Sequence, residues 1–148
     1  MDSSSISKAS GVDVAKAQVV VYKDVTCTAA LLDGAGTIEV APAKIGIQYK
    51  IRDIIMHGGG TSFAAGGNRL LDLTDGTTVY TQIANADLEA AVSASLPWGN
   101  AKVPMLTSTS NTKTVENQAL RFKYSGGTTD HSGTGSIAFT VGYTEHTV

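Results

Sequence analysis

The sequence predicts an all-β protein, an antiparallel sandwich of about eight strands with a jelly-roll-like arrangement. Three observations predict it: short segments that alternate apolar and polar residues, glycine-rich turn signals between them, and a single stretch with helical spacing. Many short strands separated by turns are typical of sandwiches and barrels. The 148 residues fit one domain, which we place at 15–148, after an extended N-terminal arm at 1–14.

The first strands are predicted from short runs of β-branched residues. Residues 17–22 are such a run, 26–32 follows as a second strand candidate, and 37–40 alternates like a third strand. The Asp33-Gly34 pair predicts a hairpin turn, because this dipeptide supplies the positive φ angles that tight turns need. Pro42 then ends the strand, as suits an edge strand or a connection.

The longest strand candidate is Ile45–Met56. In its first half apolar and polar residues alternate, which predicts a strand with one buried face. The pattern then changes register, because Asp53 falls on the apolar face and Ile54 on the polar face. A β-bulge or a move into a second sheet would explain this change.

The middle of the chain predicts a hairpin followed by the one helix. Asp75-Gly76 lies between strands at 70–73 and 77–83, so we expect a hairpin there. The helix is expected at about 85–96, with Asn85 as its N-cap and apolar residues at spacings of three and four. Pro97-Trp98-Gly99 ends it.

The end of the chain predicts a polar loop and two regular strands. Residues 100–118 are polar and favour an exposed loop with at most a weak strand. Residues 120–124 and 137–143 each alternate with period two. We expect them to pair antiparallel, joined by the glycine-rich turn at 125–135.

Composition argues for contacts with protein. Charged residues make up 16% of the chain, below the roughly 25% of ordinary soluble domains, so much of the surface is expected to meet other protein. A small β protein solvated by Ser and Thr is the alternative. The basic residues are scattered, which argues against nucleic acid as a partner. Lys50/Arg52 and Arg121/Lys123 are interpreted as solvated strand faces.

No segment of the sequence suggests export or membrane insertion. The N-terminus lacks the charged and apolar regions of a signal peptide. No apolar run approaches the ~18 residues that span a bilayer. We therefore expect the chain to be made in a cytoplasm and to have no membrane partner.

Two motifs suggest catalysis, and neither is complete. His57-Gly58-Gly59-Gly60 matches the oxyanion loop of some esterases, but no Gly-x-Ser-x-Gly nucleophile motif accompanies it. Asp130-His131-Ser132 are adjacent in an expected turn, whereas a catalytic triad needs groups that converge from separate elements. The sequence therefore predicts no enzyme and no catalytic residue.

Metal and cofactor sites are not expected either. His57, His131 and His146 lack the short spacing of zinc ligands. Asp72 and Asp75 lie near Gly76, but no alternating calcium loop follows. Cys27, the one cysteine, is expected to be a small buried apolar residue. No intrachain disulfide can form.

The arm and the tryptophan are the predicted partner-binding residues. The arm is rich in serine and carries isolated apolar residues; it is either a disordered tail or a segment that orders on a neighbouring subunit. Trp98 either closes the helix end against the core or anchors a subunit contact. The predicted interface residues are Ile6, Val12, Val14 and Trp98.

About two-thirds of the chain, 49–148, resembles small structural proteins of tailed bacteriophages, in motif order rather than in any single diagnostic motif. The resemblance is carried by four segments: Ile51-Arg52-Asp53-Ile54-Ile55 before a glycine-rich loop, Asp72–Tyr80, Pro97-Trp98-Gly99, and Tyr124–Asp130. It is greatest to capsid cement or decoration proteins, which commonly form trimers on the outer head surface. Residues 1–48 carry no such resemblance.

The resemblance implies a structural role. We expect a protein of the virion that binds the major capsid protein at the outer head surface, stabilises the shell, and forms a homotrimer. The family implies no catalytic residue and no cofactor. A receptor- or glycan-binding domain of a phage fibre or tail component is the alternative.

Overall fold

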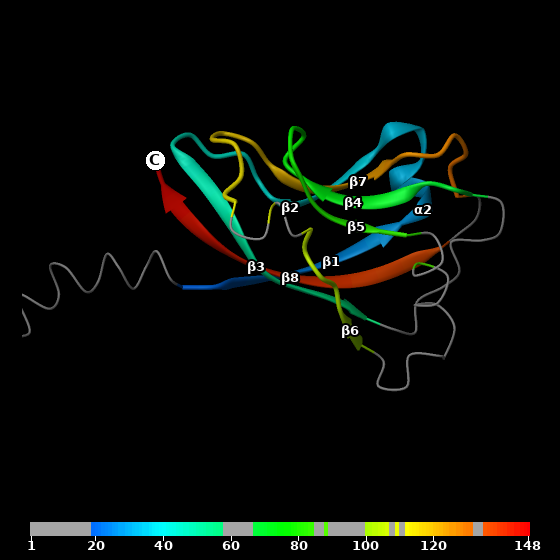
Figure 1. Cartoon of the computed structure of the whole chain (residues 1–148), viewed down its shortest axis with the longest axis horizontal. Coiled ribbons are helices and arrows are strands. Elements are labelled where there is room, and N and C mark those ends of the chain that lie inside the picture. The colour runs from blue at the N-terminus through cyan, green and yellow to red at the C-terminus, as the bar shows by residue number, and fades with distance from the viewer. Residues whose placement is uncertain are drawn as a thin grey trace, which may run out of the picture.

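A computed structural model describes residues 19–57, 67–84, 88, 100–106, 109, 112–131 and 135–148. Within them, eight strands form two antiparallel sheets of four strands each, packed face to face (Figure 1). Sheet A has, in spatial order, β1 (Val21–Thr28), β8 (Ser136–Thr147), β3 (Ile47–His57) and β6 (Asn100–Lys102). Sheet B has β2 (Thr37–Ala41), β7 (Leu120–Ser125), β4 (Leu70–Thr74) and β5 (Val79–Ile83). The predicted all-β sandwich is confirmed.

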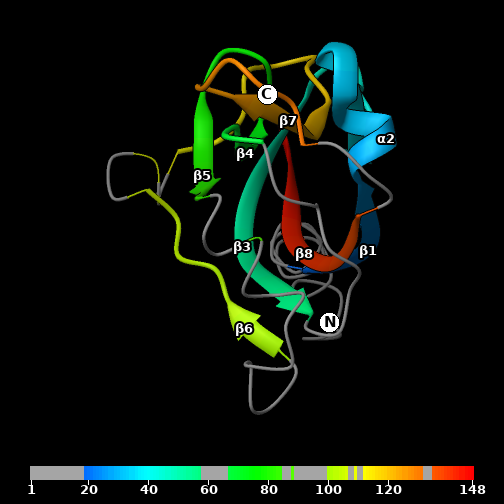
Figure 2. The same cartoon turned by 90° about the vertical axis from the view of Figure 1, so that its right-hand side faces the viewer.

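The strands pair in a nested order. The first strand pairs with the last, β2 with β7, β3 with β6 and β4 with β5. Two further pairs, β3 with β8 and β4 with β7, join these into the two sheets. The pairing is that of one long hairpin that has been folded over, so that its two ends lie together in sheet A (Figure 2).

The predicted pairing of the last two strands is wrong. β7 belongs to sheet B and β8 to sheet A, and they face each other across the core, where the rings of Phe122 and Phe139 have centroids 4.7 Å apart. Alternation predicts which face of a strand is buried and does not choose its partner. The connection at 126–135 is long enough to cross between sheets.

The predicted strand at 26–32 is wrong in its second half. Residues Ala29–Leu32 form a short helix, α2, and Asp33–Ala35 form a 3₁₀ turn. Thr28 caps the helix, because its hydroxyl accepts a hydrogen bond from the N–H of Leu31 at 3.3 Å. The Asp33-Gly34 turn therefore connects sheet A to sheet B and is not a hairpin.

Two local predictions are confirmed. β3 has a bulge: Ile51 pairs with Tyr143 and Asp53 with Gly142, which leaves Arg52 as the extra residue. β4 and β5 form the expected hairpin, in which Gly76 has a φ of +94°. The change of alternation and the Asp75-Gly76 signal are each local, although the same dipeptide at Asp33-Gly34 does not form a hairpin.

The polar segment at 100–118 is less exposed than predicted. It contains the short strand β6, as expected of a weak strand, but Thr114 is fully buried. The hydroxyl of Thr114 accepts from the N–H of Tyr49 at 2.7 Å, and the N–H of Thr114 donates to the carbonyl of Tyr49 at 2.7 Å. Residues 112–118 therefore cover part of the free edge of β3.

Of the predicted helix at 85–96, only Leu88 is among the described residues. It is helical and buried, and its N–H donates to the carbonyl of Ala84 at 3.1 Å. The domain boundary at residue 15 also lies outside the described residues. Among the described residues, no helix is long and apolar enough to span a membrane.

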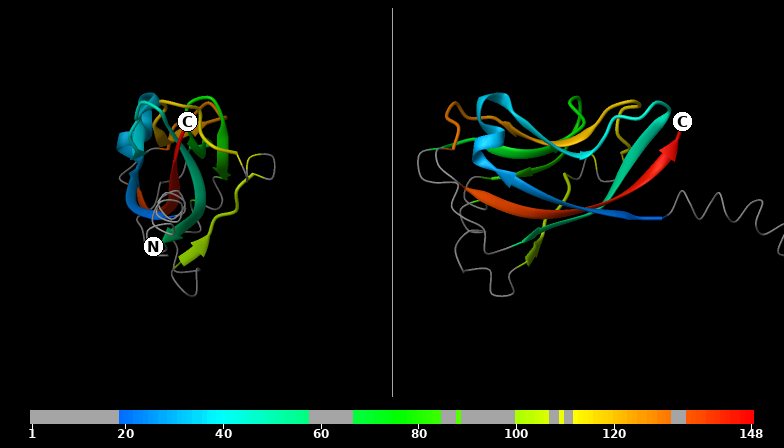
Figure 3. Two further views of the ribbon diagram at one scale, coloured as in Figure 1. Left: turned by 90° about the vertical axis from the view of Figure 1, so that its left-hand side faces the viewer. Right: turned by 180° about the vertical axis from the view of Figure 1, so that it is seen from behind.

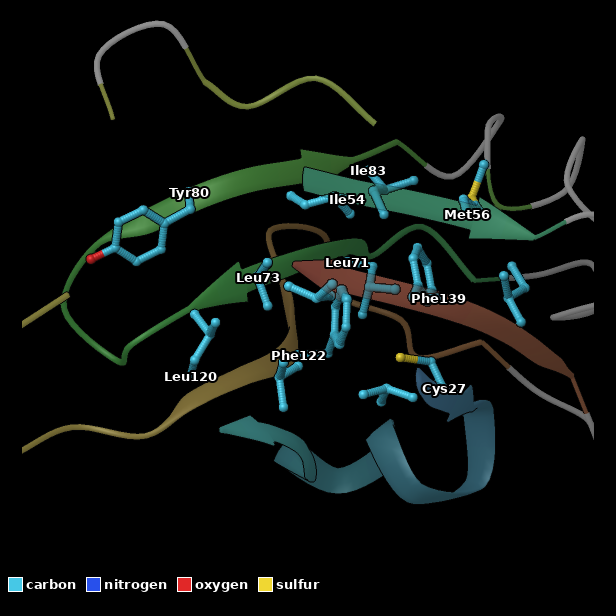
Figure 4. Close-up of a cluster of buried hydrophobic side chains, with 14 of the residues drawn as sticks. Cys27, Ile54, Met56, Leu71, Leu73, Tyr80, Ile83, Leu120, Phe122 and Phe139 are labelled. Carbon is cyan, nitrogen blue, oxygen red and sulfur yellow. The ribbon is translucent and has the colours of Figure 1, made fainter. Parts of the chain in front are cut away.

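The core lies between the two sheets (Figure 4). Leu71 and Leu73 of β4 project from sheet B toward Ile54 of β3 in sheet A, and all three are at most 1% exposed. The other large side chains that are fully buried there include Tyr49, Tyr80, Leu120, Phe122, Ile137 and Phe139.

Candidate interaction surface

The predicted interface residues lie outside the described part of the chain. This holds for Ile6, Val12 and Val14 of the arm and for Trp98. Their roles stay predictions. The described residues do include the start of β1, which is the described part of the chain nearest in sequence to the arm.

The first half of β1, together with Val19 just before it, exposes apolar side chains. Val19, Val21 and Tyr22 are 58%, 40% and 60% exposed, whereas Val25 and Cys27 farther along the strand are buried. β1 is an edge strand of sheet A and pairs only with β8 in that sheet (Figure 3). The beginning of β1 therefore offers apolar side chains and an open strand edge together.

Gly142 of β8 permits this arrangement. A Cβ at Gly142 would lie 2.8 Å from Cε1 of Tyr22 and 3.2 Å from Cγ1 of Val20. The absent side chain lets the Tyr22 ring lie against the outer face of β8. Tyr22 is thus held against the sheet while most of its surface faces outward.

Charged residues follow directly on the same edge. Lys23 and Asp24 are exposed, and charges on an edge strand limit uncontrolled pairing with other chains. Asp24 also belongs to a hydrogen-bond chain on the outer face: its carboxylate accepts from the hydroxyl of Thr140 at 2.7 Å, and Nε2 of His57 lies 2.7 Å from the same hydroxyl oxygen. Since the single hydroxyl proton goes to Asp24, His57 donates through Nε2.

The Asp130-His131 turn is structural. Asp130 accepts from the N–H of Gly34 at 2.9 Å and forms an ion pair with Arg69. These two donors hold the pKa of Asp130 below its ordinary value. His131 is buried, and its Nε2 lies 3.0 Å from the carbonyl oxygen of Arg69. The two side chains thus connect the turn at 130–131 to Gly34 and to Arg69. Ser132, the third residue of the motif, lies outside the described residues.

Asp75 forms a second network, which the sequence analysis missed. Its carboxylate is fully buried and accepts four hydrogen bonds. The donors are the N–H groups of Thr77 at 2.9 Å, Thr78 at 2.7 Å and Val115 at 2.7 Å, and the hydroxyl of Tyr80 at 2.8 Å. Burial alone would raise the pKa of this carboxyl group, but the hydrogen bonds hold it below its ordinary value.

Only part of the Asp75 network has a signal in the sequence. An aspartate that accepts from N–H groups two and three residues later is typical of a turn beginning Asp-Gly. The contact with Val115, forty residues along the chain, has no such local signal.

Cys27 is fully buried, as predicted, and burial raises the pKa of its thiol, which makes the thiol unreactive. No group of three metal-ligating side chains occurs among the described residues.

Two of the cavities on the described surface lie beside features already described. One, of about 480 Å³, lies beside the β3 bulge and is lined by Arg52, Asp53, Ile54, Val103, Pro104 and Met105. The other, of about 160 Å³, lies next to the Asp130 network and is lined by Ala35, Arg69, Lys123, Tyr124 and Asp130.

No protein-family model matches this chain, and a search of curated proteins finds no match. The protein is therefore classified by its fold alone. It is a β-sandwich whose edge strand β1 begins with exposed apolar side chains.

Proposed function

We propose that the chain is a structural protein of a bacteriophage virion, specifically a capsid cement or decoration protein. It binds the outer head surface, contacts the major capsid protein and stabilises the shell. The observation that carries the proposal is the apolar edge at the start of β1, which begins at Val21, a few residues after the predicted arm at 1–14. A chain whose entry segment presents Val19, Val21 and Tyr22 to solvent has a surface suited to burial against another protein.

Fold and resemblance support the same proposal. The nested pairing of the eight strands among the described residues supports a jelly-roll-like arrangement, an architecture common in viral capsid proteins. Fold alone does not define function. The resemblance motifs Ile51–Ile55, Asp72–Tyr80 and Tyr124–Asp130 lie in β3, in the β4–β5 hairpin and in the turn after β7.

The mechanism that follows is a two-part attachment. The arm, 1–14, lies on a neighbouring subunit by strand addition or by groove contacts. The β1 edge seats the domain beside it, and a homotrimer buries further side surfaces. Each contact excludes water from apolar side chains, so attachment resists the outward pressure on the shell.

The test is rebinding to capsids assembled without this protein. Deletion of 1–14 should weaken attachment and leave the thermal unfolding midpoint of the domain unchanged. Tyr22→Ser should also weaken attachment. Leu31→Ser is the matched control, because Leu31 is 60% exposed like Tyr22 but lies on α2, away from the β1 entry. Light scattering after size-exclusion chromatography gives the oligomeric state.

The outcomes separate the parts of the proposal. Full capsid occupancy after deletion of 1–14 would exclude the arm contact. Equal losses for Tyr22→Ser and Leu31→Ser would exclude the β1 edge. A strictly monomeric protein that does not bind capsids would contradict the whole proposal.

A receptor- or glycan-binding domain of a fibre or tail is the second candidate. One observation favours it: the hydroxyl of Tyr124 is buried without a hydrogen-bond partner among the described residues, and Tyr124 lines the cavity of about 160 Å³. Immunogold labelling of virions discriminates between the two. Label over the whole head supports the decoration protein, and label at the tail tips supports the glycan-binding domain.

A further inference from the structure

Positive charge gathers on one part of the outer face of sheet A. In the register of β3 and β8, Lys50 lies opposite Thr144 and Gln48 lies opposite His146. These four residues share the outer face, since the alternate residues Tyr49 and Tyr143 are buried in the core.

The bulge adds Arg52 to this group. Arg52 is the extra residue of the bulge, and its Nε donates to the hydroxyl oxygen of Thr144 at 3.2 Å. The same oxygen lies 2.7 Å from Nε2 of His146. Thr144 is fully buried although it points outward, because the longer side chains cover it. The guanidinium is therefore held in place, and Arg52 is itself exposed.

The segment 112–118 brings a third cation. Thr114 pairs with Tyr49 through two hydrogen bonds, which places the exposed Lys113 beside the same end of β3. The pKa of His146 is lowered by burial first, and then by the positive charges of Lys113, Arg52 and Lys50. Three positively charged side chains from two segments therefore lie close enough to His146 to lower its pKa.

Two nearby acidic groups, Glu145 and Asp24, are engaged in other contacts, whereas Glu116 is exposed in the same segment as Lys113. Glu145, next to His146, forms an ion pair with Lys44 at 2.9 Å. Asp24 accepts the hydroxyl of Thr140 at 2.7 Å. Asp53 follows Arg52, lies opposite Gly142 on the outer face and lines the same cavity as Arg52, so it offsets part of the charge at the bulge.

The outer face of sheet B is arranged differently. Its basic pair has the same spacing, but Arg121 lies opposite Glu39 of β2, and Lys123 lies opposite Asp72 of β4. Cross-strand neighbours of opposite charge stabilise each other. Sheet B therefore places an acidic residue directly opposite each residue of its basic pair, whereas in sheet A the residue opposite Lys50 is the uncharged Thr144.

We propose that the Lys50–Arg52–Lys113 face of sheet A is a docking surface for an acidic segment of a partner protein, rich in Asp or Glu. Under the proposed function that partner is the capsid subunit, so sheet A faces the shell and sheet B faces solvent. Arg52 supplies a fixed guanidinium that suits a carboxylate. Lys50 and Lys113 add positive charge near it.

A protein partner fits this surface better than a nucleic acid does. Binding to a phosphate backbone draws on long clusters of cations and on counterion release, whereas this surface has three cations on a chain of net charge −2. Tyr22, 60% exposed at the far side of β8, adds an aromatic contact of the kind enriched at protein interfaces.

The test measures binding of the full chain to a fluorescent poly-L-glutamate peptide at low salt by fluorescence anisotropy. The double variant Lys50→Gln/Arg52→Gln should bind about fivefold more weakly or worse, as expected when two exposed ion pairs are lost. The matched control is Arg121→Gln/Lys123→Gln, which removes the same charges at the same spacing from sheet B and should leave binding unchanged. Circular dichroism checks that both variants are folded.

Each outcome decides the proposal. A selective loss in the sheet A variant supports it. Equal losses in both variants mean that net charge alone matters, which overturns it. Failure of the wild-type chain to bind the peptide also overturns it, as does selective binding of single-stranded DNA in place of the peptide. A chain that binds the peptide through sheet A yet does not bind capsids retains the acidic-partner surface and loses the capsid function.

Discussion

An aspartate forms a hydrogen-bond network at each end of strand β4, and the two networks differ in their burial. At the beginning of β4, Asp130 meets Arg69 and the N–H of Gly34 at the protein surface. At its end, Asp75 is fully buried and accepts four hydrogen bonds from within the chain. When an exposed carboxylate is substituted, water can accept the hydrogen bonds that it accepted. When a buried carboxylate is substituted, its donors are left unpaired. Asp75 should therefore carry far more of the stability.

The largest effect is expected for Asp75→Asn. The amide keeps the shape of the side chain but accepts at one oxygen only, so some of the four donors lose their acceptor. We expect the free energy of unfolding to fall by about 3 kcal/mol, as is typical when buried bonds to a charged group are broken. Urea denaturation should show a lower midpoint with an unchanged slope. A loss as small as that of Asp130→Asn would remove the contrast between the two ends.

The acid side of the stability profile should follow Asp75 as well. Because its pKa is lowered in the folded chain, its contribution is fully present above the ordinary carboxyl pKa of about 3.9 and is lost as the pH falls through the folded pKa. Asp130 contributes in the same direction. Thermal midpoints measured downward from pH 5 should fall less steeply in Asp75→Asn than in the wild type. Parallel profiles for the two proteins would contradict the assignment.

The Asp130 end should be sensitive to steric change. A Cβ at Gly67 would lie 2.4 Å from Nδ1 of His131 and 2.6 Å from its backbone Cα. Since backbone cannot move aside like a flexible side chain, Gly67→Ala should destabilise the domain by about 2 kcal/mol. Gly34→Ala is the comparison, because a Cβ there meets nothing within 4 Å and only its φ of +67° is strained. Equal losses for the two variants would show that crowding at His131 is unimportant.

The smallest effect is expected for Asp130→Asn. Its carboxylate and the Arg69 side chain are each about one-third exposed (32% and 30%), and surface ion pairs contribute little to stability. The thermal midpoint should move only slightly. A shift that matches Asp75→Asn would place the dominant carboxylate at the other end of β4.

The sequence predicted features that depend on neighbouring residues. The change of alternation at Asp53 marked the bulge, and Asp75-Gly76 marked a hairpin. Both are set within a few residues of chain, where local geometry decides the outcome. The burial of Cys27 followed from its apolar surroundings in the same way.

Features that depend on distant residues were not predicted. The alternation of 120–124 and 137–143 is the same whether they pair or face each other, and the opposed rings of Phe122 and Phe139 show that they face. Nothing near Asp75 announces its contact with Val115. Lys113 and His146 are also brought near each other only by the fold. The basic surface of sheet A could therefore not be predicted from the spacing of Lys50 and Arg52. The predicted interface residues Ile6, Val12, Val14 and Trp98 stay predictions.

The nested pairing has a consequence for how the protein is made. β8 lies between β1 and β3, pairing with β1 over Ser136–Tyr143 and with β3 over Phe139–Thr147, yet it follows both of them in the chain. β1 and β3 therefore cannot join into sheet A until β8 has been synthesised, and until then each has an unpaired edge. Folds with pairings this distant in sequence fold slowly. A chain truncated before Ser136 should therefore fail to form sheet A.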